Sequence, residues 1–264
     1  MKLNTQSIGF YIEKLKNKEY YSFPGFSDAE WICMDEPKIG ERTGGHQTYT
    51  RKIGDELKEA LLAHQDDPSY MKAIPDCIIN PTWYGIERMI RNMDDWGLQV
   101  EAREFWERDY VTDELAKKSG LNPFIKQLRE MDTVVISNQY VLNIKSFLSY
   151  KHYVEIPKID IYLEKNWLKK YTKKILDYGK PAVYLYSAGF AAAPMIAEVH
   201  GKIPNSFHLD VGSIWDCFVG IGDQRGWRKE LYDDPLKWEE WIRINLEGIE
   251  HESIKLSREG RWGN

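Results

Sequence analysis

The sequence predicts one α/β domain with a Rossmann-like, mainly parallel sheet flanked by helices on both faces. In the second half of the chain, short β-branched or aromatic runs alternate with amphipathic helical patterns, and the connections are short. The 264 residues, of which 42% are apolar, suffice for one sizeable core. No repeat and no shift in composition marks a boundary, so residues 1–264 are expected to form a single domain.

The first half of the chain has a mixed pattern. Residues 4–18 predict an amphipathic helix, with Ile8, Tyr11, Ile12 and Leu15 on one face. A strand region is expected within "YYSFPGFSDAEWICM", followed by a polar loop. Beyond it we expect a helix over 51–64, a strand over 76–80 and a helix that begins near Trp83.

The second half has clearer elements. β-Branched and aromatic runs predict strands over 132–138, 152–157, 181–189 and 205–213. Helical patterns fall between them over 141–149, 163–179 and 190–201, and Gly179 is the expected C-cap of the second.

Charge and cysteine usage exclude several classes of protein. The formal net charge is −5, and no arginine- and lysine-rich block of the kind that tracks a phosphate backbone is present, so a nucleic-acid partner is not expected. The longest apolar runs are far shorter than the roughly 20 residues of a membrane span. Three widely spaced cysteines, Cys33, Cys77 and Cys217, favour a reducing cytoplasm.

Asp28 and Glu30 lie two residues apart within the expected strand region. On a strand, residues i and i+2 share a face and lie about 6 to 7 Å apart. Carboxylates on one face repel each other unless a cation or a proton lies between them. The pair is therefore either a site for a divalent ion shared with substrate phosphates, or two solvated carboxylates at a strand end.

Two loops that follow strands are candidates for ligand binding. Ser187, Ala188 and Gly189 end one strand and open a helix of small residues, which suits either an anionic ligand or tight helix–sheet packing. Asp210 ends the next strand and could bind a sugar hydroxyl, act as a base or cap the following turn. Its loop carries four further candidates: Gly212, Ser213, Asp216 and Trp215, the last as a sugar-stacking ring.

Together these segments resemble the GT-D-type glycosyltransferases, a bacterial family with a Rossmann-like fold and a D-x-E metal motif. The family's phenylalanine–glycine–aspartate–glycine–glutamate string is matched by Phe26 to Glu30. Its leucine–glycine–proline–x–alanine loop is matched by Ser187 to Ala191, and its leucine–aspartate–isoleucine–glycine–histidine string by Leu209 to Ser213. The resemblance runs from about Gly9 to Val219.

The resemblance implies a metal-dependent transfer of a sugar, expected to be a hexose, from a nucleotide-sugar donor to a hydroxyl of a glycan or glycoprotein. Asp28 and Glu30 would hold Mn²⁺ or Mg²⁺, and Asp210 would orient the donor or take the acceptor proton, which makes these three the candidate catalytic residues. The loops 187–189 and 212–216 would bind the donor.

The chain also departs from the family pattern. Gly25 stands where an arginine is usual, Ser27 and Ala29 replace two glycines, and Ser213 replaces the histidine. His46, in a glycine-containing loop, or His208 could take that histidine's role, although alternation along the strand favours a core position for His208. The alternative function is therefore a Rossmann-like nucleotide-binding or scaffold protein without catalysis.

Overall fold

The computed structural model describes residues 2–35, 39–42, 47–75, 85–98, 103–107, 113–220 and 226–251. Within these ranges the chain forms eight strands, and every strand pair is parallel. The strands are β1 (Lys2–Asn4), β2 (Ser22–Phe23), β3 (Ala73–Ile74), β4 (Glu104–Glu107), β5 (Thr133–Ser137), β6 (His152–Glu155), β7 (Val183–Tyr186) and β8 (Phe207–Asp210).

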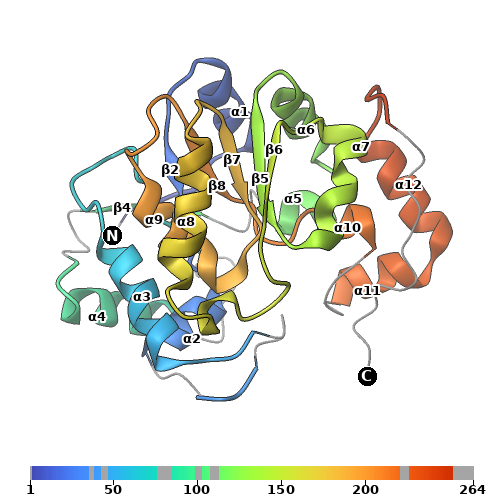
Figure 1. The fold of residues 1–264 in the computed structure, drawn as a ribbon. Helices are drawn as coiled ribbons and strands as arrows, with labels where there is room; N and C mark the ends of the chain where they lie inside the picture. Colours follow the sequence, from blue (N-terminus) through green and yellow to red (C-terminus); the bar gives the residue numbers. More distant parts are fainter. Residues whose placement is uncertain are drawn as a thin grey trace.

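Helices connect and cover the strands (Figure 1). They are α1 (Ile8–Lys16), α2 (Asp28–Asp35), α3 (Arg51–Leu62), α4 (Ile86–Asp95), α5 (Asp113–Lys117), α6 (Asn122–Arg129), α7 (Lys145–Leu148), α8 (Trp167–Tyr178), α9 (Ala192–Val199), α10 (Asp216–Val219), α11 (Gly226–Asp233) and α12 (Pro235–Asn245). Short 3₁₀ segments follow three strands: η3 (Gln139–Ile144), η4 (Ile161–Leu163) and η5 (Gly189–Ala191).

The strands form two sheets that are joined through the backbone. One sheet has the order β1-β4-β3 and the other β2-β8-β7-β5-β6. Parallel bridges connect Ser22 with Tyr70 and Gly25 with Ala73, so β3 continues the larger sheet beside β2. The described strands therefore form one continuous parallel arrangement.

Alternating residues of the strands face two hydrophobic clusters. Tyr184 and Tyr186 of β7 belong to the cluster that also includes residues of α2, α3, α8 and α9. Val183 and Leu185 belong to the cluster on the opposite face, with residues of α1, α6, α7, α10 and α12. Figure 1 shows these two groups of helices on either side of the sheet. The predicted fold class, a parallel sheet covered on both faces, is confirmed.

The elements predicted in the second half agree closely with the structure. All four strands are present, and Gly179 caps α8 in the left-handed conformation, with φ = 53°. The first helix begins at Ile8 rather than residue 4, because Lys2–Asn4 pair with β4. The strand expected over 76–80 and the helix start near Trp83 lie outside the described residues.

The prediction of a strand around Asp28 and Glu30 is wrong. Strand β2 is only two residues long, and both carboxylates lie in the first turn of α2. Trp31, on the same helix, is buried and stacks on Trp96 with the ring centroids 6.1 Å apart.

Candidate active site

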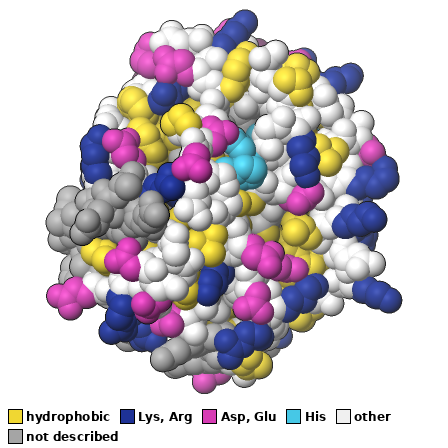
Figure 2. Space-filling view, turned by 90° about the vertical axis from the view of Figure 1, so that its left-hand side faces the viewer, with side chains coloured by type: hydrophobic (Ala, Val, Ile, Leu, Met, Phe, Trp, Pro, Cys, Tyr) yellow, Lys and Arg dark blue, Asp and Glu magenta, His cyan; other side chains and the backbone are white. Residues whose placement is uncertain are grey.

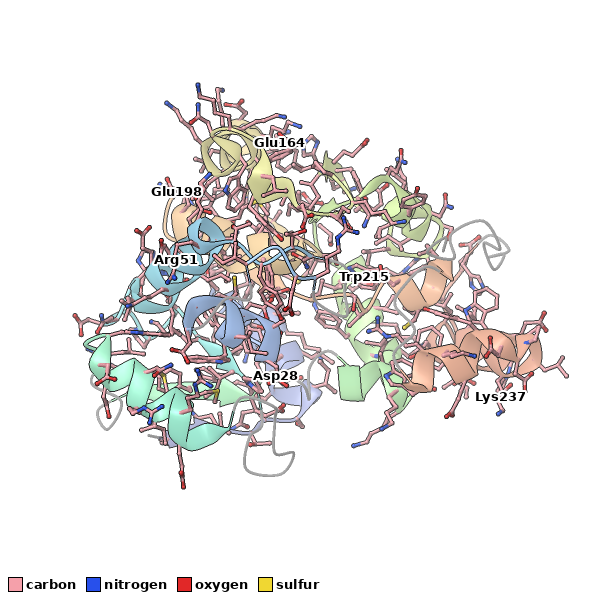
Figure 3. All side chains as sticks on the ribbon, turned by 90° about the horizontal axis from the view of Figure 1, so that it is seen from below. Asp28, Arg51, Glu164, Glu198, Trp215 and Lys237 are labelled. Atoms are coloured by element: carbon pink, nitrogen blue, oxygen red, sulfur yellow. The ribbon has the colours of Figure 1, made fainter. Side chains whose placement is uncertain are left out.

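The candidate site lies where three neighbouring parallel strands end. Strands β2, β8 and β7 are adjacent, with Phe23 in register with Leu209 and Tyr186 in register with Asp210. The loops that follow them lead into α2, α10 and α9, respectively. Ligands of open α/β sheets bind at this carboxyl edge. Figure 3 views the molecule from this side, with Asp28 and Trp215 labelled.

Asp28 and Glu30 do not share one face. Positions i and i+2 of an α-helix are separated by about 200° of rotation, so their side chains diverge. Asp28 is half-buried, whereas Glu30 is only 7% exposed. On a strand the two carboxylates would have been adjacent ligands for one ion. On the helix they point in different directions and lie in different surroundings.

Glu30 caps its own helix. Its carboxylate accepts a hydrogen bond from the Ser27 backbone N–H, with N···Oε2 at 2.9 Å, and a second one from the Ser27 hydroxyl. The first intrahelical bond runs from Trp31 N–H to the Ser27 carbonyl. Serine followed three residues later by glutamate is the capping-box pattern. This pattern, in "SDAE", is the sequence signal that would have predicted the helix.

The loop after β7 is covered by Gln47. Gly189 has φ = +53°, and a Cβ atom there would lie 1.8 Å from Gln47 Nε2. Gln47 Oε1 accepts a hydrogen bond from the Phe190 N–H at 2.8 Å. The absence of a side chain at Gly189 therefore accommodates another side chain of the protein. The approach of a ligand to Gly189 stays a prediction, and it requires Gln47 to move.

The segment that carries Gln47 is fastened to the loop after β6. Thr48 donates to Asp160 through both its N–H and its hydroxyl, each at 2.8 Å. The Tyr162 hydroxyl donates to the Thr48 carbonyl at 2.7 Å. These bonds hold the segment against the carboxyl edge of the sheet. A single sequence gives no signal for this arrangement, because the partners are more than 100 residues apart.

Ser187 places a buried hydroxyl group at the same edge. Its backbone continues the sheet, since its N–H donates to the Ile136 carbonyl at 2.9 Å. Its hydroxyl oxygen is buried and has no hydrogen-bond partner among the described residues. Ala188, the next residue, is buried.

The loop after β8 is held by its own polar groups. Asp210 is 5% exposed, and its Oδ1 accepts from the Gly212 N–H at 2.9 Å, which makes a tight turn. The Ser213 hydroxyl accepts from Arg228 Nη1 at 2.8 Å. Arg228, on α11, is 1% exposed and is a functional candidate that the sequence reasoning missed.

Trp215 is not available for sugar stacking in this conformation. Its ring is 0% exposed and lies between Phe147 and Phe218, with ring centroids 6.4 and 6.2 Å away. The sugar-stacking role is therefore corrected to a core role. Asp216 begins α10 and is half-buried, with its N–H donating to the Ser213 carbonyl.

His208 is a core residue, as its position on the strand predicted. Its ring stacks on Tyr184, and its Nδ1 lies 2.9 Å from the Tyr186 hydroxyl. Burial lowers the pKa of His208 to about 3, so the ring is neutral at physiological pH. His46 lies outside the described residues.

The described residues contain no group of three histidine, cysteine or acidic side chains that could hold a metal ion. The acidic side chains described at the carboxyl edge fit an ion that takes part of its ligands from a bound substrate, as Mg²⁺ commonly does. In the same ranges, no helix is long and apolar enough to cross a membrane.

No protein-family model and no curated protein matches the chain. Three-dimensional comparison finds a structure described as a new glycosyltransferase (DUF1792) from Streptococcus sanguinis, with a TM-score of 0.52, 15% identity, and coverage of 81% of this chain and 82% of that one. A second, described as a DUF1792 domain with a distinct glycosyltransferase fold, has a TM-score of 0.53, 14% identity, and coverage of 99% and 95%. A selenomethionine structure of DUF1792 has a TM-score of 0.54 and 15% identity, with the same coverage. The chain therefore shares the fold of these glycosyltransferase structures.

Proposed function

We propose that this protein is a metal-dependent glycosyltransferase that moves a sugar from a nucleotide-sugar donor to a hydroxyl group of a glycan or glycoprotein. The observation that carries the proposal is the carboxyl edge itself. Asp28 and Ser187 follow β2 and β7, and Asp210 ends β8 between them, in a sheet whose fold is shared with glycosyltransferase structures over nearly the whole chain. The unpartnered Ser187 hydroxyl supports a polar ligand there.

The two carboxylates of α2 have different proposed roles. Asp28 would hold a divalent ion, Mn²⁺ or Mg²⁺, together with the diphosphate of the donor. Glu30 would position Asp28 by fixing the first turn of the helix, because its carboxylate is already bonded to Ser27. When bound, the ion would neutralise the negative charge that develops on the leaving diphosphate.

The other residues of the edge would bind and orient the donor. Ser187 would hydrogen-bond the donor, and Asp210 would orient its sugar or accept the proton of the acceptor hydroxyl. Arg228 would fix the loop of Ser213 through its buried guanidinium. Gln47 would have to move or become a ligand contact if the donor approaches Gly189.

A nucleotide-binding protein without catalysis is the second candidate. The engagement of Glu30 in helix capping favours it, because this leaves one carboxylate of the D-x-E pair for an ion.

Thermal unfolding tests both candidates in four conditions: with Mn²⁺ or with EDTA, each in the presence and in the absence of a nucleoside diphosphate. Nucleoside diphosphates should raise the melting temperature more with Mn²⁺ than with EDTA, because only the folded state binds the pair. Turnover of a panel of nucleotide sugars then separates an enzyme from a binding protein. Equal melting temperatures with and without every nucleotide would contradict both candidates.

A further inference from the structure

The lysines of helix α8 are interrupted by apolar and polar residues in the sequence and form no continuous basic block, but the helix brings them together into a concentrated positive charge. Residues 163–180 contain six lysines and only two acidic residues, Glu164 and Asp177, which gives this segment a net charge of +4 in a chain whose net charge is −5. All six lysines are exposed. We call them the α8 lysine face: Lys165, Lys169, Lys170, Lys173, Lys174 and Lys180.

Most of this charge is not neutralised within the protein. Lys170 pairs with Glu164 at 2.7 Å, and Lys173 pairs with Asp177 at 2.6 Å. The other four lysines make no ion pair with any described residue. Two of them, Lys174 and Lys180, lie over tyrosine rings instead, which leaves their charge in place.

The helix is held in place by its opposite side. Trp167, Tyr171 and Ile175 are buried in the core, and the Trp167 indole N–H donates to Glu56 at 3.0 Å. Lysines spaced four apart, such as Lys169 and Lys173, destabilise a helix by mutual repulsion. The lysine face is therefore an array of mostly unpaired like charges on a helix that is anchored by its buried side, which points to an external anionic partner.

Helix α8 lies at the front of Figure 1, and this side of the molecule forms the right-hand edge of Figure 2. Lysine and arginine side chains gather along that edge in Figure 2. In Figure 3 nitrogen-tipped side chains surround the labelled Glu164 at the start of the helix. Helix α8 follows β6, so it begins at the carboxyl edge of the sheet, and the lysine face starts there.

We propose that the α8 lysine face docks on an anionic membrane surface, with phospholipid headgroups as the partner. Clusters of four to eight basic residues on a helix bind such surfaces. Leu163, at the carboxyl-edge end of the face, is 59% exposed and can enter the headgroup region beside the lysines. Two features disfavour nucleic acid as the partner. The face contains no arginine, the residue that forms bidentate bonds to phosphate, and its nearby Tyr171 is buried, so that ring cannot stack on a base.

This docking would place the candidate site next to the membrane. Because α8 begins at the carboxyl edge, the edge lies at one end of the docked face and stays open to ligands. The inference does not rest on the proposed enzymatic function, since the lysines and Leu163 are outside the candidate site.

Co-sedimentation with lipid vesicles tests the proposal on the full chain, without donor or acceptor. The probes are phosphatidylcholine vesicles with and without about 30% phosphatidylserine, at about 0.1 M salt. We expect binding to the anionic vesicles only, and its loss near 1 M salt, where the screening length falls to about 3 Å.

A matched pair of variants locates the contact. Changing Lys165, Lys169, Lys174 and Lys180 together to glutamine should weaken vesicle binding several hundred-fold, at about fivefold for each lysine. The control changes the same number of exposed lysines on other helices to glutamine: Lys16, Lys126, Lys229 and Lys237. It should bind within about twofold to threefold of wild type, because its net charge matches but the α8 face is intact. Thermal unfolding confirms that both variants are folded.

Three results would overturn the proposal. The first is equal binding of wild type to neutral and anionic vesicles, including no binding to either. The second is unchanged binding by the folded α8 variant. The third is that a duplex oligonucleotide binds the wild type while anionic vesicles do not, which would assign the face to nucleic acid.

Discussion

Replacing Glu30 with glutamine tests whether this carboxylate positions the first turn of α2. The amide nearly keeps the shape of the side chain, and its oxygen can still accept both hydrogen bonds from Ser27. It loses the charge, however, and a hydrogen bond to a charged group is roughly twice as strong as a neutral one. Since two bonds from Ser27 converge on this carboxylate, we expect the free energy of unfolding to fall by about 1 to 2 kcal/mol.

Asp28→Asn is the matched comparison, because it removes the same charge from the same helical turn. Asp28 is half-buried, and as a first-turn carboxylate it contributes about 0.3 to 1 kcal/mol through the helix dipole. We therefore expect Asp28→Asn to be less destabilising than Glu30→Gln. Its effect on sugar transfer should be larger, because Asp28 is the proposed ion ligand.

Urea unfolding of four proteins measures the contribution of the cap. Ser27→Ala, Glu30→Gln, the double variant and wild type form a cycle in which the two residues should couple by about 1 kcal/mol. In melting temperature, Glu30→Gln should lose roughly 2 to 4 °C per kcal/mol for a chain of this size. Additive effects of the two substitutions, or an Asp28→Asn variant less stable than Glu30→Gln, would refute this account of α2.

Three further substitutions test other parts of the structure. Gly189→Ala should destabilise the protein by about 1 to 3 kcal/mol, because φ is positive and the new Cβ meets Gln47. Adding Gln47→Ala should restore only part of the lost stability, and full recovery would show that backbone strain at Gly189 is negligible. Ser213→Ala should lower the free energy of unfolding by about 1 to 2 kcal/mol through loss of the bond from Arg228, and an unchanged urea midpoint would contradict this. His208 has a folded pKa of about 3, below its unfolded value of 6.5, so the unfolded state alone takes up a proton as the pH falls below 6.5. The free energy of unfolding should therefore decline as the pH falls from 6.5 towards 3, and protonation of His208 in the unfolded state should account for about 2 kcal/mol of this decline by pH 5. In urea unfolding at pH 6.5 and at pH 5, His208→Gln should remove that part of the decline.

The second half of the fold could be predicted because its neighbouring strands β5 and β7 are fully buried. Residues 133–137 and 183–186 are buried on both faces, so they form continuous runs of β-branched and aromatic residues. The first half lacks this signal, because β2 and β3 have only two residues each and pair with β8 and β4, which are distant from them in the sequence. Such short strands are specified by tertiary contacts, which periodicity cannot detect.

The sequence predicted which strand ends carry the candidate site, but it did not predict how the side chains there are arranged. Asp210 and Ser187 were correctly expected at strand ends, since an apolar run followed by small and polar residues marks the carboxyl edge. The α2 helix was missed because its aromatic and small residues resemble a strand, while its capping box was not considered. Gln47 could not have been predicted, because its contact with Phe190 joins segments 143 residues apart. Arg228 is only 15 residues from Ser213, but a single side-chain bond between a helix and a loop gives no periodic pattern in the sequence.

The helical placement of Asp28 and Glu30 changes what metal dependence should look like. Where the resembled family has a glycine, this chain has Ser27, whose hydroxyl and N–H both engage Glu30. An ion held by Asp28 then takes most of its ligands from the diphosphate, because hard divalent cations need about six oxygens. Mn²⁺ alone should therefore leave the melting temperature nearly unchanged, and the shift should appear only when the nucleotide is also present. A strong shift with Mn²⁺ alone would require a preformed cation site, which a capped Glu30 does not provide.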